Sequence, residues 1–414
     1  MSTPTPTPTV RLSTFSAFRH RNYRLYWVGQ LISQTGTWMQ SLGQQWLVLQ
    51  LTNSALWLGV VGFCSSIPVL LLTLFGGVVA DRVDRRKFLV FTQSAAACQA
   101  LALATLTLTG RVHIWHVVAA ALTLGTINAF DTPTRQAFVV EMVGKEDLAN
   151  AIALNSSIFN GARIFGPAIA GVLVAIPQVG PGGAFLLNAL SFLAVIGSLL
   201  LMDHHHVPGV ARTQSMRANL VEGLTYARSN KTVSTLMLTA SITSIFGMSY
   251  ASMLPVFAKD ILKVGAPGQG IMMTCIGIGA VIGSLTVATL ASLQRKGMVW
   301  TAGNLLFPPM LLLLALSRSF PLTLASLFVL GFALIVQNST TNTLLQTTTP
   351  DHLRGRVMGL YNLTFQGMTP FGSLQAGIVA NAFGAPVAVG IGGLMCLGRA
   401  VWLLVRAPQI RRLP

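Results

Sequence analysis

The chain has 414 residues, of which 52% are hydrophobic and only 9% are charged. Soluble domains carry about 25% charged residues, so this composition excludes a large soluble protein and indicates a polytopic membrane protein. The net charge of +17 does not indicate nucleic-acid binding, because the cations are scattered in short loops rather than gathered with aromatic residues on one face. The 4 cysteines lie inside apolar runs without paired spacing, which argues against disulfides and a cysteine metal site.

Apolar segments long enough to span a bilayer recur along the chain and predict an all-α protein with twelve transmembrane helices. The expected spans are 23–49, 55–79, 88–109, 114–137, 150–175, 183–202, 232–257, 269–292, 298–317, 321–346, 356–381 and 386–406. The longest polar stretch divides them into two groups of six. The expected parts are a disordered cytoplasmic tail (1–22), an N-terminal six-helix half (23–202), a cytoplasmic linker (203–231), a C-terminal six-helix half (232–406) and a cytoplasmic tail (407–414).

Lysine and arginine are concentrated on one side of the predicted membrane. Arg163 and Arg399 fall inside helices, and the opposite side carries only Arg111, Lys259, Lys263 and Arg318. Cytoplasmic loops of membrane proteins carry an excess of these residues. The pattern therefore predicts a multi-pass protein of a bacterial-type inner membrane, with both termini and the linker in the cytoplasm.

A charged loop lies between the second and third predicted helices and reads Gly77-Val-Val-Ala-Asp-Arg-Val-Asp-Arg-Arg86. It resembles the signature Gly-x-Leu-Ala-Asp-Arg-x-Gly-Arg-Arg of the major facilitator superfamily, with Val79 in place of leucine and Asp84 in place of glycine. A stop-transfer charge cluster is the alternative interpretation. The resemblance implies a twelve-helix transporter fold with two six-helix repeats.

The same resemblance implies that this loop is a conformational latch. Its expected residues are Gly77, Asp81, Arg82, Arg85 and Arg86. We expect Asp81 to lie at the N-terminal end of the eleventh helix, near Arg356, when the cytoplasmic side is closed. The positive end of a helix dipole stabilises an anion there by about 0.3–1 kcal/mol.

Three charged residues are candidates for an intramembrane charge and coupling site. Asp131 and Arg135 are four residues apart and share one helix face, although Pro133 disturbs the helix between them. Arg163 lies near the centre of the fifth helix, where a charge needs a partner or a wet cavity. We expect Asp131 to be that partner, with the arginine snorkelling toward it. A purely structural pair between the fourth and fifth helices is the alternative.

An internal repeat relates the two halves of the chain. The spacing of Gly125, Gly161, Gly166 and Gly171 recurs at Gly331, Gly367, Gly372 and Gly377. Parallel repeats of this kind are typical of secondary transporters, and chance coincidence is the alternative. The small residues that we expect at helix contacts are Gly161, Gly166, Pro167, Gly171, Gly367, Gly372 and Gly377.

Two motifs narrow the resemblance to an efflux branch. Asp131-x-Pro133-x-Arg135-Gln136-Ala137, followed by Gly166-Pro167-x-x-x-Gly171, resembles exporters related to the enterobactin exporter. The second motif is also similar to the antiporter signature of drug exporters. The resemblance implies export, and it specifies the substrate only weakly.

Polar and aromatic residues on otherwise apolar helices predict a substrate cavity. They are Gln34, Trp38, Gln45, Asn160, Tyr250, Gln337, Asn338, Asn342 and Gln366. Gln34, Trp38 and Gln45 recur at helical spacing and share one face of the first helix. Superfamily cavities are lined mainly by helices 1, 4, 7 and 10, with which most of this set agrees. Hydrogen bonding between helices is the alternative for each residue.

These patterns predict a secondary active transporter that exports small siderophore-like or drug-like molecules by alternating access, with proton antiport as the expected energy source. An importer or a lipid flippase on the same fold is the first alternative, and a non-transporting membrane sensor or scaffold is the second. The chain contains only 10 acidic residues, and none lies at a helix centre. Asp131 is therefore the candidate proton carrier.

Enzymatic activity is not expected, because the sequence contains neither a phosphate-binding loop nor a nucleophile triad. We expect no cofactor and no metal, and interpret the histidines at 204–206 as part of a solvated linker. The expected partners are a small-molecule substrate and the lipid bilayer, without nucleic acid, and the expected functional unit is a monomer.

Overall fold

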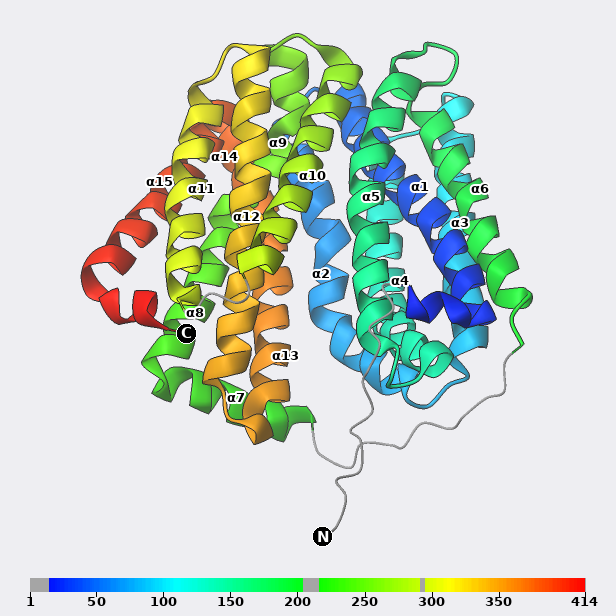
Figure 1. The fold of residues 1–414 in the computed structure, drawn as a ribbon. Helices are drawn as coiled ribbons and strands as arrows, with labels where there is room; N and C mark the ends of the chain where they lie inside the picture. Colours follow the sequence, from blue (N-terminus) through cyan, green and yellow to red (C-terminus); the bar gives the residue numbers. More distant parts are fainter. Residues whose placement is uncertain (1–14, 204–215, 291–294, 414) are drawn as a thin grey trace.

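The computed structural model describes residues 15–203, 216–290 and 295–413, and these residues form helices and connections without a β-strand. Figure 1 shows two helical bundles side by side. The first contains η1 (Ser16–Arg19), α1 (Arg21–Thr52), α2 (Ala55–Ala80), α3 (Arg85–Leu108), α4 (Ile114–Val143), α5 (Leu148–Ala175) and α6 (Gly180–Leu200). The second contains α8 (Lys231–Ile242), η2 (Thr243–Gly247), α9 (Tyr250–Val256), η3 (Phe257–Ile261), α10 (Gly265–Thr289), α11 (Lys296–Leu316), α12 (Phe320–Thr348), α13 (Asp351–Gly367), α14 (Thr369–Phe383) and α15 (Ala385–Arg406).

Twelve segments of the described chain cross the bundle. Ten are long and apolar enough to span a membrane by length and composition, and one of these joins α8, η2, α9 and η3 in a single span. The eleventh, α1, has 32 residues but carries many polar side chains, including the buried Gln30 and Gln40. The twelfth is interrupted at Met368, just before Pro370, and is divided into α13 and α14. The predicted polytopic all-α fold is confirmed.

The repeat seen in the sequence has a structural counterpart. A Cβ added at Gly125 of α4 would collide with the carbonyl oxygen of Ser65 in α2, and one at Gly331 of α12 would collide with that of Ile276 in α10. Equivalent glycines thus let equivalent helix pairs approach closely in each half. Small residues serve this purpose in membranes because apolar lipid leaves little hydrophobic force between helices.

Close backbone contacts also join the two halves. A Cβ at Gly59 of α2 would lie 2.8 Å from the Cα of Gly377 in α14, and one at Gly171 of α5 would lie 3.2 Å from the Cα of Gly270 in α10. Both contacts lie toward the end where α2 and α10 begin and α5 and α14 end. We call this the sealed end, and the opposite end, where α1 begins, the α7 end, after the helix α7 (Met216–Ser229) that lies there (Figure 1).

Polar contacts reinforce the sealed end. Three hydrogen bonds cross between the halves there: Ser54 Oγ to Asn381 Oδ1 (2.9 Å), Lys259 Nζ to Asn53 Oδ1 (2.7 Å) and Gln269 Nε2 to Gln45 Oε1 (2.8 Å). Toward the α7 end, by contrast, a Cβ at Gly77 of α2 or Gly359 of α13 would meet no atom within 4 Å. Close contacts between the halves are thus found at the sealed end, whereas these two glycines toward the α7 end face open space.

The range predicted as a linker contains a helix. α7 lies against the start of α13, where Glu222 forms an ion pair with Arg356 and the Tyr226 hydroxyl donates a hydrogen bond to the Thr348 carbonyl (3.3 Å). Residues 204–215, including the histidines at 204–206, lie outside the described residues.

The predicted tails also have structure where they are described. Residues 1–14 lie outside the described residues, whereas η1 is tied to α5 by a hydrogen bond from the Ala17 amide to Asn150 Oδ1 (3.0 Å). After α15, η5 (Pro408–Arg412) packs on α11, and the Gly297 amide donates a hydrogen bond to the Leu413 carbonyl (3.2 Å). Both ends of the described chain therefore pack against the bundle.

We predict that Gly59→Ala destabilises the protein. The new Cβ would lie 2.6 Å from the Ser373 carbonyl oxygen, so the α2 and α14 backbones must separate. Such overpacking costs about 1–3 kcal/mol and should lower the midpoint of thermal unfolding in detergent. Gly197→Ala in α6 is the matched control, because its Cβ meets no atom within 4 Å. Equal midpoints for the two variants would contradict the close contact.

Candidate transport site

A cavity of about 600 Å³ lies mainly within the first half of the fold. Its lining residues are Tyr26, Gln30, Ser33, Gln34, Thr37, Trp38, Ser41, Val69, Gln93, Ala96, Leu124, Ile127, Asn128, Thr132, Arg135, Gln136, Val139, Asn155, Ile158, Phe159, Phe192 and Gln366. Gln366 of α13 is the contribution of the second half. The volume is in the range of sites that hold drug-sized ligands.

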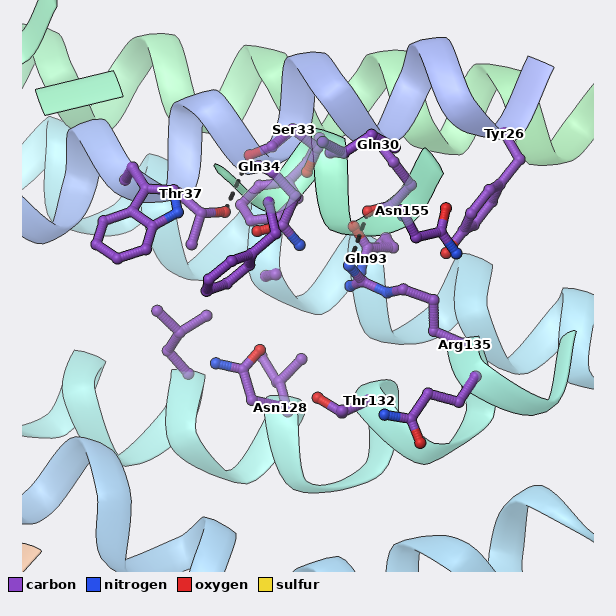
Figure 2. A pocket seen from close by; sticks show the side chains of 18 of the residues that line it. Tyr26, Gln30, Ser33, Gln34, Thr37, Gln93, Asn128, Thr132, Arg135 and Asn155 are labelled. Carbon is purple, nitrogen blue, oxygen red and sulfur yellow. Dashed lines mark hydrogen bonds between the residues drawn. The ribbon is translucent and has the colours of Figure 1, made fainter. Parts of the chain in front are cut away.

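Amides, hydroxyls and aromatic rings dominate the cavity wall. Figure 2 shows α1 residues such as Gln34 and Thr37 on one side and Asn128 and Thr132 of α4 on the other. Arg135 is the one charged residue among the lining residues, which include no carboxylate. The cavity therefore offers hydrogen-bond donors and acceptors beside flat apolar surfaces.

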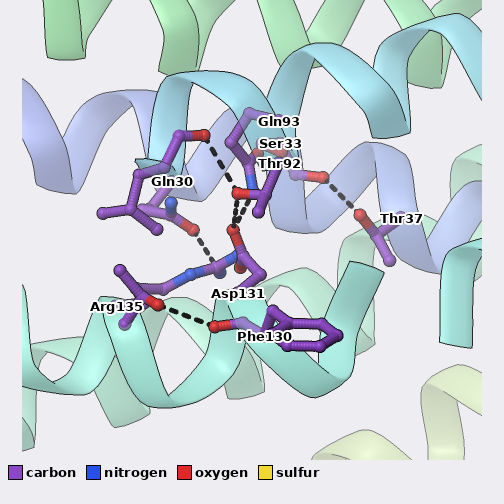
Figure 3. Close-up of polar contacts among 10 residues, drawn as sticks. Gln30, Ser33, Thr37, Thr92, Gln93, Phe130, Asp131 and Arg135 are labelled. Atoms are coloured by element: carbon purple, nitrogen blue, oxygen red, sulfur yellow. Dashed lines mark hydrogen bonds and ion pairs between the residues drawn. The ribbon is translucent and has the colours of Figure 1, made fainter. Parts of the chain in front are cut away.

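A buried carboxylate lies directly behind this wall. Asp131 of α4 is 1% exposed and accepts hydrogen bonds from Thr92 Oγ1 (2.7 Å) and Gln93 Nε2 (2.8 Å) of α3. Its other oxygen forms an ion pair with Arg135, as Figure 3 shows. Arg135 also donates a hydrogen bond to Gln30 Oε1 of α1 (2.7 Å). One ion pair thus links α1, α3 and α4 at the edge of the cavity.

The predicted pairing of Asp131 and Arg135 is present, and the predicted pairing of Asp131 with Arg163 is wrong. Asp131 is directed toward α3, whereas the Arg163 guanidinium carbon lies 5.9 Å from the centre of the Trp38 ring. The helix continues through Pro133 to Val143, so Asp131 lies well inside α4 rather than close to its end. Arg135 is therefore close enough to neutralise Asp131 without any snorkelling by Arg163.

Three of the nine predicted cavity residues, Gln34, Trp38 and Gln366, line the cavity. Gln45 instead joins the sealed end through Gln269, and Gln337 donates a hydrogen bond to Thr243 Oγ1 (2.8 Å). Asn160 donates a hydrogen bond to the Ser156 carbonyl (2.9 Å), and Asn342 accepts one from Gln346 (2.5 Å). Tyr250 is buried, and neither Tyr250 nor Asn338 lines the cavity. Helical spacing identifies a shared face, but it does not identify the neighbour that covers that face.

Sequence reasoning missed several residues of the cavity wall. Gln30, Gln93 and Asn128 line it, and each is a polar residue within a segment that was predicted to span the membrane. Gln93 carried the clearest signal, because it interrupts the third apolar segment in the same way that Gln34 interrupts the first. Applying one criterion to every helix would have found all three.

Most of the predicted packing residues are in tight contact. A Cβ at Gly166 would lie 2.6 Å from that of Trp38, while Gly367 packs on Leu70 and Gly372 on the Ile245 backbone. The Pro167 carbonyl oxygen would lie 2.5 Å from a Cβ at Gly270. Gly161 is the exception, because no atom lies within 4 Å of its Cβ position.

The latch residues form contacts within the first half. Asp81 lies 3.6 Å from Arg85, which also forms an ion pair with Glu141 of α4. Arg86 donates hydrogen bonds to the carbonyls at the end of α6, and Arg82 is exposed. Gly77 faces open space. Asp84, where the signature has glycine, caps α3 by accepting a hydrogen bond from the Lys87 amide (3.1 Å).

The chain matches a family model over nearly its whole length. Residues 12–413 match the model described as transmembrane secretion effector. The chain belongs to this family. The predicted membership of the major facilitator superfamily, with resemblance to its efflux branch, is confirmed. The family and its neighbours are transporters and not enzymes.

Curated relatives cover most of the chain at low identity. The staphyloferrin A transporter of Staphylococcus aureus is 28% identical over 91% of this chain and 94% of its own length. The multidrug efflux pump Tap of Mycolicibacterium fortuitum is 26% identical, over 82% and 84% respectively. The macrolide efflux protein A of Streptococcus pyogenes is 20% identical, over 88% and 92%. This transmembrane secretion effector is thus similar to transporters with different named substrates.

Solved structures share the fold. The nucleoside transporter NupG aligns with a TM-score of 0.73 at 14% identity, covering 93% of this chain and 98% of its own. A bacterial homologue of the human lysosomal transporter Spinster aligns with a TM-score of 0.72 at 12% identity, covering 95% and 96%. At these identities the likeness concerns the fold alone.

We predict that Asp131 and Arg135 are energetically coupled. Asp131→Asn removes the negative charge that pairs with the Arg135 guanidinium. Breaking a buried ion pair costs about 3–5 kcal/mol of stability. The thermal midpoint should fall in Asp131→Asn and recover in part when Arg135→Gln is added. Arg21 and Asp203 form the control pair, because their side chains are 55% and 87% exposed and such pairs contribute little. Similar coupling in both double-mutant cycles would contradict the prediction.

Proposed function

We propose that this transmembrane secretion effector exports small molecules across the cytoplasmic membrane by alternating access. The observation that carries the proposal is the cavity of about 600 Å³, which lies among helices whose halves meet closely at the sealed end and separate at the α7 end. Alternating access requires a site that borders two bodies, which open at one end while they close at the other. The cavity lies mainly in the first half, and Gln366 of α13 brings the second half to its wall. The glycine contacts of Gly59 and Gly171 supply a closed end.

The distribution of cations supports an orientation. The connections at the sealed end contain Arg111, Lys259, Lys263 and Arg318, whereas most cations of the described ranges lie at the α7 end. By the positive-inside rule the α7 end faces the cytoplasm, and both termini are cytoplasmic. In this orientation the structure is the cytoplasm-facing state, and a substrate enters the cavity from inside the cell.

Export is the direction that we assign. Two of the relatives carry efflux in their names, the multidrug efflux pump Tap and the macrolide efflux protein A. The polar and aromatic cavity wall fits a small organic molecule better than it fits an ion, because an ion needs a dense shell of oxygen ligands or opposite charge. A siderophore-like or drug-like substrate follows from these two points.

The buried ion pair is the proposed site of proton coupling. A proton on Asp131 removes the negative charge that holds Arg135 and weakens the link between α1, α3 and α4. These helices also line the cavity, so protonation and substrate binding act on the same packing. A ligand shifts a conformational equilibrium only if its affinity for the two states differs. The proton would have different affinities for Asp131 in a state with the Arg135 ion pair and in a state without it.

The coupling prediction concerns proton movement in inside-out vesicles with an acidic interior. A panel of siderophores, antibiotics and lipophilic cations should contain a compound that dissipates the gradient with the wild type and fails to do so with Asp131→Asn. Asp351→Asn is the control, because that carboxylate is 89% exposed and pairs with Arg354 on the surface. Dissipation by Asp131→Asn at the wild-type rate would exclude Asp131 as the carrier. Uptake of the labelled compound by right-side-out vesicles alone would indicate import.

The latch is proposed to work by exchange of ion-pair partners. In the present state Asp81 lies near Arg85, and Arg356 forms an ion pair with Glu222 of α7. When the α7 end closes, α2 approaches α13, and Asp81 comes within reach of Arg356 and the N-terminal end of that helix. The helix dipole and the arginine then both stabilise the carboxylate.

We predict that Asp81→Asn inserts and folds normally but transports at a rate reduced about tenfold or more. The reason is that the closed state loses the interaction of Asp81 with Arg356 and the helix N-terminus, whereas the open state loses only a 3.6 Å contact with Arg85, which keeps its ion pair with Glu141. Labelled-substrate uptake should be compared at equal protein in the membrane. Asp84→Asn is the matched control, since asparagine caps a helix about as well as aspartate. Normal transport by Asp81→Asn would rule out the latch.

A further inference from the structure

Arg163 occupies an unusual place in the fold. It lies near the middle of α5, the helix of the first half that packs against α10 of the second half. A Cβ at Gly277 of α10 would lie 3.4 Å from the Arg163 carbonyl oxygen. The next residue, Ile164, accepts a hydrogen bond from Thr274 Oγ1 (3.0 Å). Tyr250 of α9 lies within electrostatic range of the guanidinium. Arg163 is therefore held against the second half while belonging to the first.

Two other arginines that lie within membrane-spanning segments, Arg135 and Arg399, have their charge or donors satisfied by the protein. Arg135 forms an ion pair with Asp131. Arg399 of α15 donates hydrogen bonds to Thr239 Oγ1 and the Thr235 carbonyl, both at 3.1 Å. The ion pairs among the described residues do not include Arg163, and its one assigned side-chain contact is with the Trp38 ring.

A guanidinium in this position needs a counter-charge. Charged side chains inside membrane segments face the bundle interior or a water-filled cavity and pair with another group, and such positions mark ligand pathways. The ring of Trp38 compensates part of the charge by a cation–π contact. Within residues 15–203, 216–290 and 295–413, no hydrogen bond from the guanidinium N–H groups is found. A planar carboxylate matches that fork of donors in a bidentate arrangement.

Trp38 connects Arg163 to the cavity, although Arg163 itself is not among the lining residues. Trp38 contacts Arg163 and also lines the cavity, together with Phe159, whose ring lies 5.7 Å away in an edge-on arrangement. The lining residues include one arginine, several amides and no carboxylate. The wall therefore offers no anionic group to a cationic substrate. It offers hydrogen-bond donors to an anionic substrate, and the Arg163 guanidinium lies behind the rings of Trp38 and Phe159.

We propose that Arg163 binds an anionic group of the substrate, and that the substrate class is an organic carboxylate with an apolar or aromatic body. This inference rests on the proposed function and specifies its substrate. The body packs against Trp38 and Phe159, and the carboxylate passes beside these rings to the guanidinium. Because the Arg163 backbone packs against Gly277 of α10, the bound carboxylate lies at the junction of the halves, where it can influence their closure.

The experiment compares three probes that share one body: 1-pyrenebutyrate, 1-pyrenebutanol and 1-pyrenebutylamine. Binding to the purified full chain is measured by energy transfer from tryptophan to pyrene, and transport by protein-dependent uptake into inside-out vesicles. The wild type should bind the carboxylate about tenfold tighter than the other two probes. Arg163→Gln should abolish that preference, and Arg163→Lys should keep part of it, since lysine retains the charge and loses the planar fork.

Arg399→Gln is the matched control for removing an intramembrane arginine. It should leave the preference for carboxylate unchanged, because Arg399 already bonds to Thr239 and Thr235 within its own half. Size-exclusion profiles of all variants check that they fold. A carboxylate affinity of Arg163→Gln equal to that of the wild type would overturn the assignment of Arg163.

The outcomes separate this inference from the proposed export. Equal or tighter wild-type binding of the alcohol or the amine, with uptake of those probes, overturns the carboxylate preference and leaves export standing. Carboxylate binding that depends on Arg163, without uptake of any probe, supports the anion site and counts against export. The absence of binding by all three probes overturns the anion site.

Discussion

The architecture depends on how closely helix backbones approach one another at glycine. In a bilayer the hydrophobic effect does not hold helices together, so packing at short range must do so. The same residue type serves two kinds of contact here. Gly125 and Gly331 fasten helices within each half, whereas Gly59, Gly171 and their partners join the halves at one end only. The first kind keeps each half rigid, and the second leaves the other end free to open.

Few charged side chains lie inside the helical bundle, and the free-energy cost of burying each is offset in a different way. The Asp131–Arg135 pair shares its burial among three helices, which satisfy it with Gln30, Thr92 and Gln93. A buried pair of this kind adds little net stability but is costly to break, so the loss of either charge weakens the link among the three helices. Arg163 has no such ion pair among the described residues. An anionic substrate in the nearby cavity is the proposed counter-charge.

The sequence allowed the fold to be predicted because a membrane admits few solutions for apolar segments of this length. The charged loop at Asp81 and the spaced glycines then indicated the superfamily. The helix α7 was missed, since its 14 residues lie in a polar stretch without an apolar run long enough to span a membrane. α4 was ended too early, at residue 137 instead of Val143. The helix continues through Pro133, because proline is tolerated inside transmembrane helices when neighbouring helices support the freed backbone.

The site was predicted less well than the fold for a physical reason. Periodicity places residues on a helix face, but the rotation of that face toward a cavity or toward another helix depends on tertiary contacts. Gln34 and Gln45 lie on the same face of α1, yet one lines the cavity and the other bonds to Gln269 at the sealed end. Pairing was mistaken for the same reason, since Asp131 turns to α3 and away from α5.

The charge of the substrate also bears on the energy source. Moving one elementary charge across the membrane is worth about 2.3 kcal/mol per 100 mV. In a cell with a negative interior, an anion held by Arg163 therefore leaves down the electrical gradient, whereas a cation leaves against it. An exporter of carboxylates needs less from its proton site than an exporter of lipophilic cations does.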